Sequence, residues 1–249
     1  MQRFPLNLIQ ALRDARHVVA LTGSGISAES GVPTFREAQG GLWERYYPQD
    51  LATPEAFARD PRLVWEWYEW RRNLGVEAEP NAGHRVLAEL ERLVPDFILV
   101  TQNVDGLHER AGSRTVIELH GNILRSKCAL EGEVASPREG DDAVPPRCPR
   151  CGAFLRPDVV WYGEALPPGT LEAASDAARG CDIFLSVGTS SLVYPAAALP
   201  YEAIESGATL VEINPNETPL TRHADHSLRG PAGEVLPGLL REAFGLGPR

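Results

Sequence analysis

Residues 17–28 of this chain read HVVALTGSGISA, an apolar run followed at once by a Gly-x-Gly-x-x-Ala turn. An apolar run of this length is typical of a strand buried on both faces, and hence of a mostly parallel sheet. Glycines at these positions allow a tight turn into a helix and let backbone N–H groups approach a pyrophosphate. The segment therefore predicts a strand–turn–helix unit, and it favours nucleotide binding over a turn without a ligand.

Similar apolar runs recur along the chain and alternate with amphipathic helical patterns. The further predicted strands are Phe97–Thr101, Thr115–Leu119, Asp182–Val187 and Thr209–Ile213. The predicted helices are Leu6–Arg13, His84–Leu93, Leu171–Ala178, Ala196–Glu205 and Val235–Phe244. Buried strands that alternate with helices are typical of a parallel sheet covered on both faces. We predict an α/β fold with a doubly wound, Rossmann-like parallel sheet.

Two segments break this alternation and read as insertions. The first, about residues 36–81, is rich in aromatic residues, and the second, about residues 121–157, holds three of the four cysteines. We expect them to pack together as a small helical and zinc-ribbon-like module. The predicted nucleotide-binding domain then comprises residues 1–35, 82–120 and 158–249.

The composition excludes several classes of protein. Of 249 residues, 43% are hydrophobic and 23% are charged, which excludes a disordered or fibrous chain. A net charge of −10 argues against binding to duplex nucleic acid, whose phosphates need a basic surface. No apolar run approaches the ~20 residues of a membrane-spanning helix, and residues 1–7 do not resemble a signal peptide. We expect a cytoplasmic protein that binds neither nucleic acid nor a membrane.

Polar segments follow the predicted strands at four further places. They are residues 101–108 (TQNVDGLH), 118–121 (ELHG), 188–191 (GTSS) and 213–216 (INPN). Open α/β sheets bind ligands at the carboxyl ends of their strands. We therefore expect these segments to line one site.

With these segments the chain resembles the sirtuin family of NAD-dependent protein deacylases. The resemblance runs from Leu21 to about Pro237, and residues 22–36, TGSGISAESGVPTFR, match the phosphate loop of the family with Ser24 where alanine is usual. It implies a Rossmann-like fold, NAD as a consumed co-substrate, and acylated-lysine proteins or peptides as substrates.

The resemblance also implies roles for residues at the strand ends. Around the pyrophosphate and nicotinamide it places Gly23, Ser24, Gly25, Phe35 and Arg36. Facing the nicotinamide ribose and carboxamide it places Gln102, Asn103 and Asp105, and at the adenosine end Gly188, Ser190, Asn214 and Ala232. In isolation Asn103 and Asp105 would read as a turn whose side chains bond their own backbone; five matching segments favour binding.

His120 is the predicted catalytic base. Of six histidines it alone ends a predicted strand and precedes a glycine, which leaves room for a substrate. A lone histidine is often structural, but the reaction needs a group that titrates near neutral pH. In sirtuins the acyl-lysine oxygen attacks the ribose carbon that bears nicotinamide and expels it. The histidine then deprotonates a ribose hydroxyl, which attacks the imidate carbon, and the products are free lysine and acyl-ADP-ribose.

The cysteines predict a metal site that departs from the family pattern at one position. Cys148 and Cys151 form one Cys-x-x-Cys pair, whereas Cys128 is followed by Glu131 where a second thiolate belongs. Three thiolates with Glu131 or water can complete a tetrahedral site, although structural zinc prefers four nitrogen or sulfur ligands. We predict zinc on Cys128, Cys148 and Cys151; a module held by packing alone stays the alternative. Cys181 reads as a small buried hydrophobe.

A helix predicted over Trp65–Arg72 bears on which acyl group is removed. Tyr68 and Arg71, at i and i+3, share one face, and the Tyr-x-x-Arg pair resembles the motif of the class III sirtuin branch that removes succinyl and malonyl groups. The alternative is an amphipathic helix with its arginines in water, and we adopt that interpretation for Arg72. The resemblance further implies that a substrate peptide adds as a strand at Val159–Glu164.

We therefore predict an NAD-dependent protein-lysine deacylase that removes succinyl, malonyl and acetyl groups. The alternatives are an NAD-dependent protein ADP-ribosyltransferase, a hydride-transferring NAD enzyme and a zinc-ribbon adaptor without catalysis. A hydride-transferring enzyme would carry an acidic residue at the end of a second strand about 20 residues after the turn. Residues 40–44, GGLWE, occupy that place and are not strand-like. The sequence does not indicate an oligomeric state.

Overall fold

The computed structural model describes residues 3–33, 47–140 and 142–245 of the chain. Phe35 and Arg36, which the resemblance places near the pyrophosphate and nicotinamide, lie outside the described residues.

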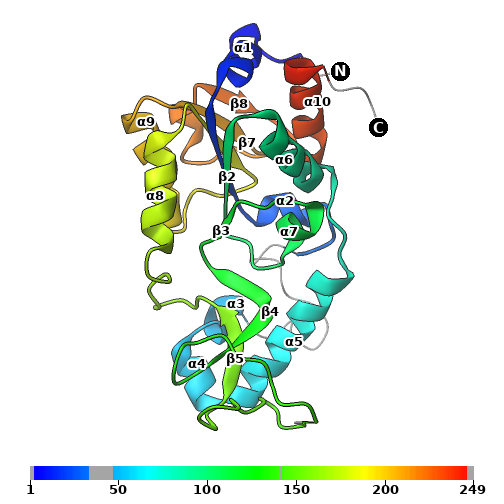
Figure 1. Cartoon of the computed structure of the whole chain (residues 1–249), viewed down its shortest axis with the longest axis vertical. Coiled ribbons are helices and arrows are strands. Elements are labelled where there is room, and N and C mark those ends of the chain that lie inside the picture. The colour runs from blue at the N-terminus through cyan, green and yellow to red at the C-terminus, as the bar shows by residue number, and fades with distance from the viewer. Residues whose placement is uncertain (1–2, 34–46, 141, 246–249) are drawn as a thin grey trace.

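A six-stranded parallel sheet forms the centre of the larger part of the molecule (Figure 1). Its strands are β1 His17–Thr22, β2 Asp96–Thr101, β3 Val116–Glu118, β6 Ile183–Val187, β7 Thr209–Ile213 and β8 His226–Leu228. They lie in the order β3-β2-β1-β6-β7-β8, and every neighbouring pair is parallel. The chain thus winds outward from β1 in both directions, and the two halves separate between β1 and β6. Such a switch point is where doubly wound sheets bind ligands.

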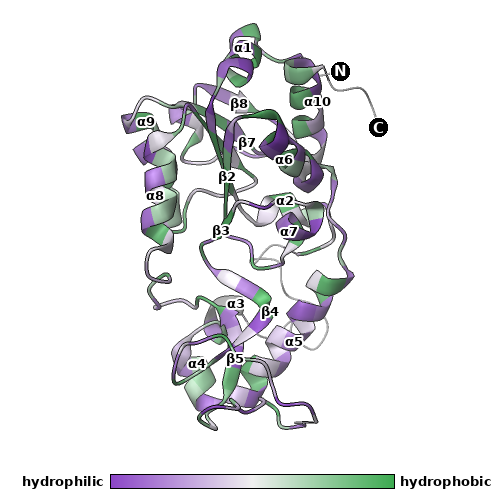
Figure 2. Ribbon diagram, viewed as in Figure 1, coloured by the Kyte–Doolittle hydropathy of each residue, from purple (hydrophilic) through white to green (hydrophobic). Residues whose placement is uncertain are grey.

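Helices cover both faces of this sheet. They are α1 Leu6–Asp14, α2 Ser24–Ala28, α6 Ala82–Leu93, α7 Leu107–Ala111, α8 Thr170–Gly180, α9 Leu199–Glu205 and α10 Ala232–Phe244, with the 3-10 turns η2 Ala196–Ala198 and η3 Thr221–His223. Val18 packs with residues of α1, α6 and α10, whereas Val19 packs on the opposite face with residues of α8 and α9. Figure 2 shows hydrophobic residues on the central strands. The prediction of a doubly wound sheet with strands buried on both faces is confirmed.

The predicted elements agree with the structure apart from their ends. The helix expected over 196–205 is divided into η2 and α9, because Pro200 lies in the first turn of α9 and has no N–H to continue an earlier helix. Strand β8 was not predicted, because its residues, His226-Ser227-Leu228, include a single apolar side chain and form no apolar run. No helix within the described ranges has the length and apolar character needed to cross a membrane.

A smaller module lies at the lower end of Figure 1. It contains α3 Pro48–Leu51, α4 Pro54–Arg59, α5 Pro61–Glu77 and the antiparallel pair of β4 Gly121–Cys128 with β5 Leu155–Val159. Residues of both insertions, Phe57 and Ile123 among them, pack in one core with Val159 and Trp161. Val159 and Trp161 lie beyond the boundary predicted at residue 157. The domain limits stay a prediction.

Candidate active site

The segments that follow β1, β2, β6 and β7 are joined by side-chain hydrogen bonds at the carboxyl edge of the sheet. Asn103 Nδ2 donates to the carbonyl oxygen of Gly23 at 3.1 Å. Gln102 Nε2 donates to Thr189 Oγ1 at 2.9 Å, and Asn214 Nδ2 donates to the Thr189 carbonyl oxygen at 2.8 Å. The structure therefore brings these predicted site residues to one edge, where the two halves of the sheet separate.

Two glycines allow the turns after β1 and β6 to touch. The N–H of Gly25 donates to the carbonyl oxygen of Gly188 at 2.8 Å, and a Cβ on Gly25 would lie 2.6 Å from that oxygen. Gly188 has a φ of +59°, in the left-handed region that favours glycine. Neither position accepts a side chain, so bare backbone occupies the switch point. This suits the approach of a dinucleotide pyrophosphate.

The other predicted NAD residues lie around these turns. Ser24 begins α2, Ser190 follows the turn after β6, and both are half-buried. Ala232 is buried at the start of α10, whose next residue, Gly233, donates its N–H to Glu29 Oε1 at 2.9 Å. Their contacts with NAD stay a prediction.

Asp105 is buried between the strand ends and the small module. Its Oδ1 accepts the N–H of Leu107 at 3.0 Å, which is the local turn that the sequence offered as the alternative. Burial raises the pKa of the Asp105 carboxyl, while hydrogen bonds from Leu107 and Ser27 and the charge of Arg71 lower it in part. Asp105 thus forms a turn and also lies near Arg71.

His120 lies between the end of β3 at Glu118 and the start of β4 at Gly121. Its Nδ1 lies 2.9 Å from the carbonyl oxygen of Gln102, and Nε2 has no hydrogen-bond partner within the described residues. Burial lowers the pKa of His120, an effect that the bond to Gln102 partly opposes. Gly121 has a φ of +77°, and a Cβ there would lie 2.2 Å from the Asp158 carbonyl oxygen. Because burial lowers the pKa of His120 and the Gln102 carbonyl oxygen fixes Nδ1, the ring is a neutral imidazole, the form that can accept a proton.

A set of polar side chains next to Asn103 was not predicted from the sequence. Ser27 Oγ accepts a hydrogen bond from Asn103 Nδ2 at 3.0 Å and lies 3.4 Å from His84 Nε2. The ring of His84 is 4.8 Å from that of His108, whose Nε2 is 2.9 Å from Thr22 Oγ1. Burial lowers the pKa of His84 to about 4. Neutral His84 thus supports Asn103 through Ser27, and the signal in the sequence was the hydroxyl residue Ser27 just after the Gly-x-Gly turn.

Tyr68 and Arg71 lie on α5, which comes close to Asp105 at Gly75. Tyr68 is 2% exposed, and its ring centroid is 6.2 Å from that of Trp161. Burial raises the pKa of Tyr68 to about 12, so its hydroxyl keeps its proton and can donate. Burial also lowers the pKa of Arg71, while Tyr68, Asp105 and Tyr162 raise it in part through their charge interactions. The pair therefore shares one region with Asp105.

The prediction that Arg72 lies in water is wrong. Its Nε donates to the Ile123 carbonyl oxygen at 2.7 Å, it forms an ion pair with Glu69, and its side chain is only 19% exposed. The guanidinium carbon lies 5.4 Å from the centroid of the Trp65 ring. The difference arises because α5 packs against β4, which covers the side of the helix that carries Arg72.

The predicted peptide edge, Val159–Glu164, is held by Arg156. The guanidinium forms two hydrogen bonds to Glu164, of 2.5 and 2.8 Å, and a third to the Val159 carbonyl oxygen at 2.9 Å. Its carbon lies 3.3 Å from the centroid of the Trp161 ring. The N–H groups of residues 160–162 donate to His120, Glu164 and Ala52, respectively. A peptide strand at this edge would therefore use other backbone groups.

The cysteines of the small module converge with Glu131. The sulfur atoms of Cys128, Cys148 and Cys151 and a carboxylate oxygen of Glu131 all lie within 4.8 Å of one another. This donor set fits a tetrahedral zinc ion, whose bonds to sulfur are about 2.3 Å long. The Glu131 carboxylate also pairs with Arg150 at 2.8 Å. Cys181 is buried elsewhere as expected, and burial raises its pKa to about 12.

Known proteins are similar to this chain in sequence and in architecture. The profile of the Sir2 family matches residues 23–195. The NAD-dependent protein deacylase 2 of Pyrobaculum aerophilum is 54% identical to this chain over 237 residues, which cover 95% of each chain.

Two solved structures are similar over nearly their whole length. A Sir2 homologue in complex with NAD superposes with a TM-score of 0.91 at 48% identity, covering 98% of this chain and 95% of the other. A Sir2 homologue with three substitutions, in complex with 2′-O-acetyl ADP-ribose, has a TM-score of 0.89 at 49% identity and covers 97% of both chains.

Proposed function

This chain belongs to the Sir2 family, and from that premise we propose that it is an NAD-dependent protein-lysine deacylase that acts on acyl groups with a terminal carboxylate, such as succinyl and malonyl, and also on acetyl. One observation carries the acyl preference. Helix α5 brings half-buried Arg71 into charge interaction with Tyr68 and Asp105, both of which are buried.

The residues at the strand ends divide the work of the reaction. Bound NAD supplies an electrophilic ribose carbon and nicotinamide as its leaving group. Gly23, Gly25 and Gly188 have no side chains, so their backbone can approach the pyrophosphate. At the nicotinamide end, a hydrogen bond to Ser27 Oγ holds the side chain of Asn103. His120 accepts a proton at Nε2, since its Nδ1–H is held by Gln102.

The acyl group is selected by charge. The guanidinium of Arg71 is half-buried, and desolvation disfavours its charge. A carboxylate at the end of a succinyl or malonyl chain offsets that cost, and two parallel N–H bonds from Arg71 suit its planar geometry. The hydroxyl of Tyr68 adds a donor. An acetyl group gains none of these contacts.

The proposed contacts of Arg71 and Tyr68 with an acyl carboxylate suggest the experiment. Peptides that carry acetyl-, malonyl- or succinyl-lysine are incubated side by side with NAD, and the intact mass of each peptide is measured. We expect loss of the acyl group in all three, fastest for succinyl and malonyl, with one nicotinamide released per lysine freed. A peptide that gains the mass of ADP-ribose would identify a transferase instead, and turnover without NAD would overturn the proposal. A cytoplasmic location stays a prediction.

A further inference from the structure

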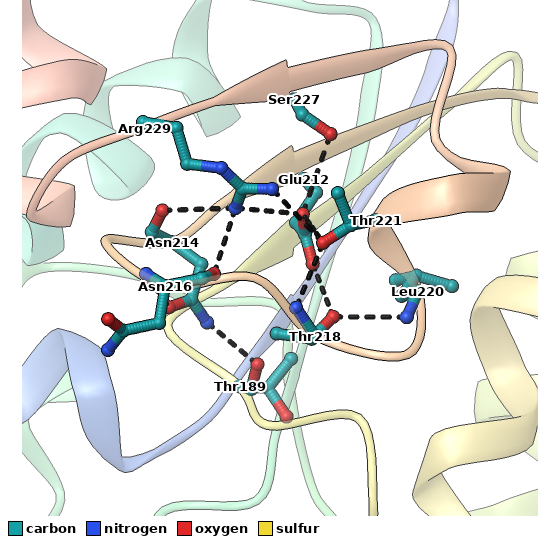
Figure 3. Close-up of polar contacts among 9 residues, drawn as sticks. All are labelled: Thr189, Glu212, Asn214, Asn216, Thr218, Leu220, Thr221, Ser227 and Arg229. Carbon is teal, nitrogen blue, oxygen red and sulfur yellow. Dashed lines mark hydrogen bonds and ion pairs between the residues drawn. The ribbon is translucent and has the colours of Figure 1, made fainter.

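Glu212 is a deeply buried carboxylate near the carboxyl end of β7. It is 1% exposed, and Figure 3 shows it surrounded by polar side chains. Oε2 accepts hydrogen bonds from Thr221 at 2.7 Å and from Arg229 Nη1 at 3.1 Å, and Oε1 accepts the hydroxyl of Thr218. A buried carboxylate is tolerated only when it is paired and hydrogen-bonded in this way.

Arg229 connects that carboxylate to the turn after β7. Besides Glu212, its Nη1 donates to the carbonyl oxygens of Asn216 at 2.8 Å and Asn214 at 3.4 Å. Its Nη2 donates to Thr221 Oγ1 at 3.1 Å. One guanidinium therefore holds two backbone carbonyls of a turn against a charge fixed inside the protein (Figure 3).

The held turn carries a predicted NAD residue. Asn214 Oδ1 accepts the N–H of Asn216 at 3.1 Å, and its Nδ2 donates to the Thr189 carbonyl oxygen at 2.8 Å, in the turn after β6. Arg229 thus holds the backbone of the turn from which the Asn214 side chain reaches the turn after β6. A rotation of this backbone would move Asn214 away from Thr189.

We propose that Glu212 and Arg229 are positioning residues for the adenosine end of NAD. They hold the Asn214–Asn216 turn in the shape that binds adenosine, and they take no part in the chemical step at His120. The inference rests on the proposed function, because it assumes that Asn214 contacts NAD. It predicts an effect confined to one end of the dinucleotide.

The test compares Arg229→Met and Glu212→Gln with the unaltered protein. We expect the KM for NAD and the Kd for ADP-ribose to rise about tenfold, which corresponds to about 1.4 kcal/mol. We expect kcat and the inhibition constant for nicotinamide, which binds at the other end, to stay within about twofold. Arg229→Lys should recover part of the affinity, since an ammonium still pairs with Glu212. Arg222→Met is the control, because Arg222 is exposed on η3 and bonds only to His223 among the described residues.

The outcomes separate this inference from the function on which it rests. If the unaltered protein binds no ADP-ribose and frees no lysine, the proposed function fails. If it does both, and Arg229→Met changes only thermal stability or lowers kcat as much as the affinity for NAD, the pair is merely structural and the inference is overturned.

Discussion

The Nδ1 atom of His120 lies 2.9 Å from the carbonyl oxygen of Gln102. A carbonyl oxygen accepts but never donates, so Nδ1 carries the ring proton and Nε2 carries the lone pair. Burial favours this neutral ring by lowering the pKa of His120 below its ordinary value of about 6.5.

This geometry predicts the pH dependence of turnover. Since the base acts in its neutral form, activity should be flat above about pH 6.5 and should fall as the pH drops through the lowered pKa of His120. His120→Ala should lower kcat about 10²- to 10⁴-fold without changing the Kd for NAD. His17→Ala is the matched control, because His17 pairs with Asp96 on the surface. If the kcat of His120→Ala stayed within a few-fold of that of the unaltered enzyme, another residue would be the base.

Arg71→Met should selectively impair removal of succinyl and malonyl groups. Loss of one partner from a buried charge pair costs roughly 2–5 kcal/mol, so kcat/KM on a succinyl peptide should fall about 30-fold to several thousand-fold. Deacetylation should change little, because acetyl has no carboxylate. An equal loss on both substrates would make Arg71 a structural residue.

The control for that variant must come from another part of α5. Arg62→Met is suitable, since the Arg62 side chain is 72% exposed and its ion pair is with Glu66 on the same helix. Arg72→Met is unsuitable, because Arg72 bonds to the backbone of Ile123. We expect it to lower the free energy of unfolding by about 1–3 kcal/mol, measurable by denaturant titration.

Metal analysis of protein purified without added zinc should find up to one zinc ion per chain. Cys148→Ser should then lower both zinc content and thermal stability, because a structural metal adds its binding energy to folding. Glu131→Cys should tighten zinc binding by completing four thiolates. Cys181→Ala, remote from the cluster, should leave zinc content unchanged. Metal-free protein with a harmless Cys148→Ser would show a module held by packing alone.

NAD should stabilise the folded protein. At about 100 times its dissociation constant, a ligand that binds only the folded state adds about 2.7 kcal/mol to the free energy of unfolding. In a domain of this size that raises the melting temperature by about 5–10 °C. Ser24→Ala, which introduces the residue usual in the family, should keep this effect. A melting temperature unmoved by millimolar NAD, with or without acyl peptide, would contradict the NAD site.

Much of the fold and part of the site could be predicted because they depend on short stretches of chain. The apolar run His17–Thr22 and the glycines after it specify a buried strand and a tight turn through contacts among near neighbours. Polar residues at strand ends then meet at one edge of any parallel sheet, which is why Gln102, Asn103 and Asn214 could be placed at one site. The spacing of Cys148 and Cys151 is equally local.

Other features depended on which faces meet when distant segments pack. Whether Arg72 lies in water is settled by the packing of α5 on β4, about 50 residues away. Glu212 reads in sequence as a polar interruption of a strand, and only the folded chain places Arg229 and two threonine hydroxyls around it. Likewise, Arg71 and Asp105 come together through the placement of the small module against the sheet. Burial and charge pairing between remote residues depend on the whole assembly of elements, so no local pattern encodes them.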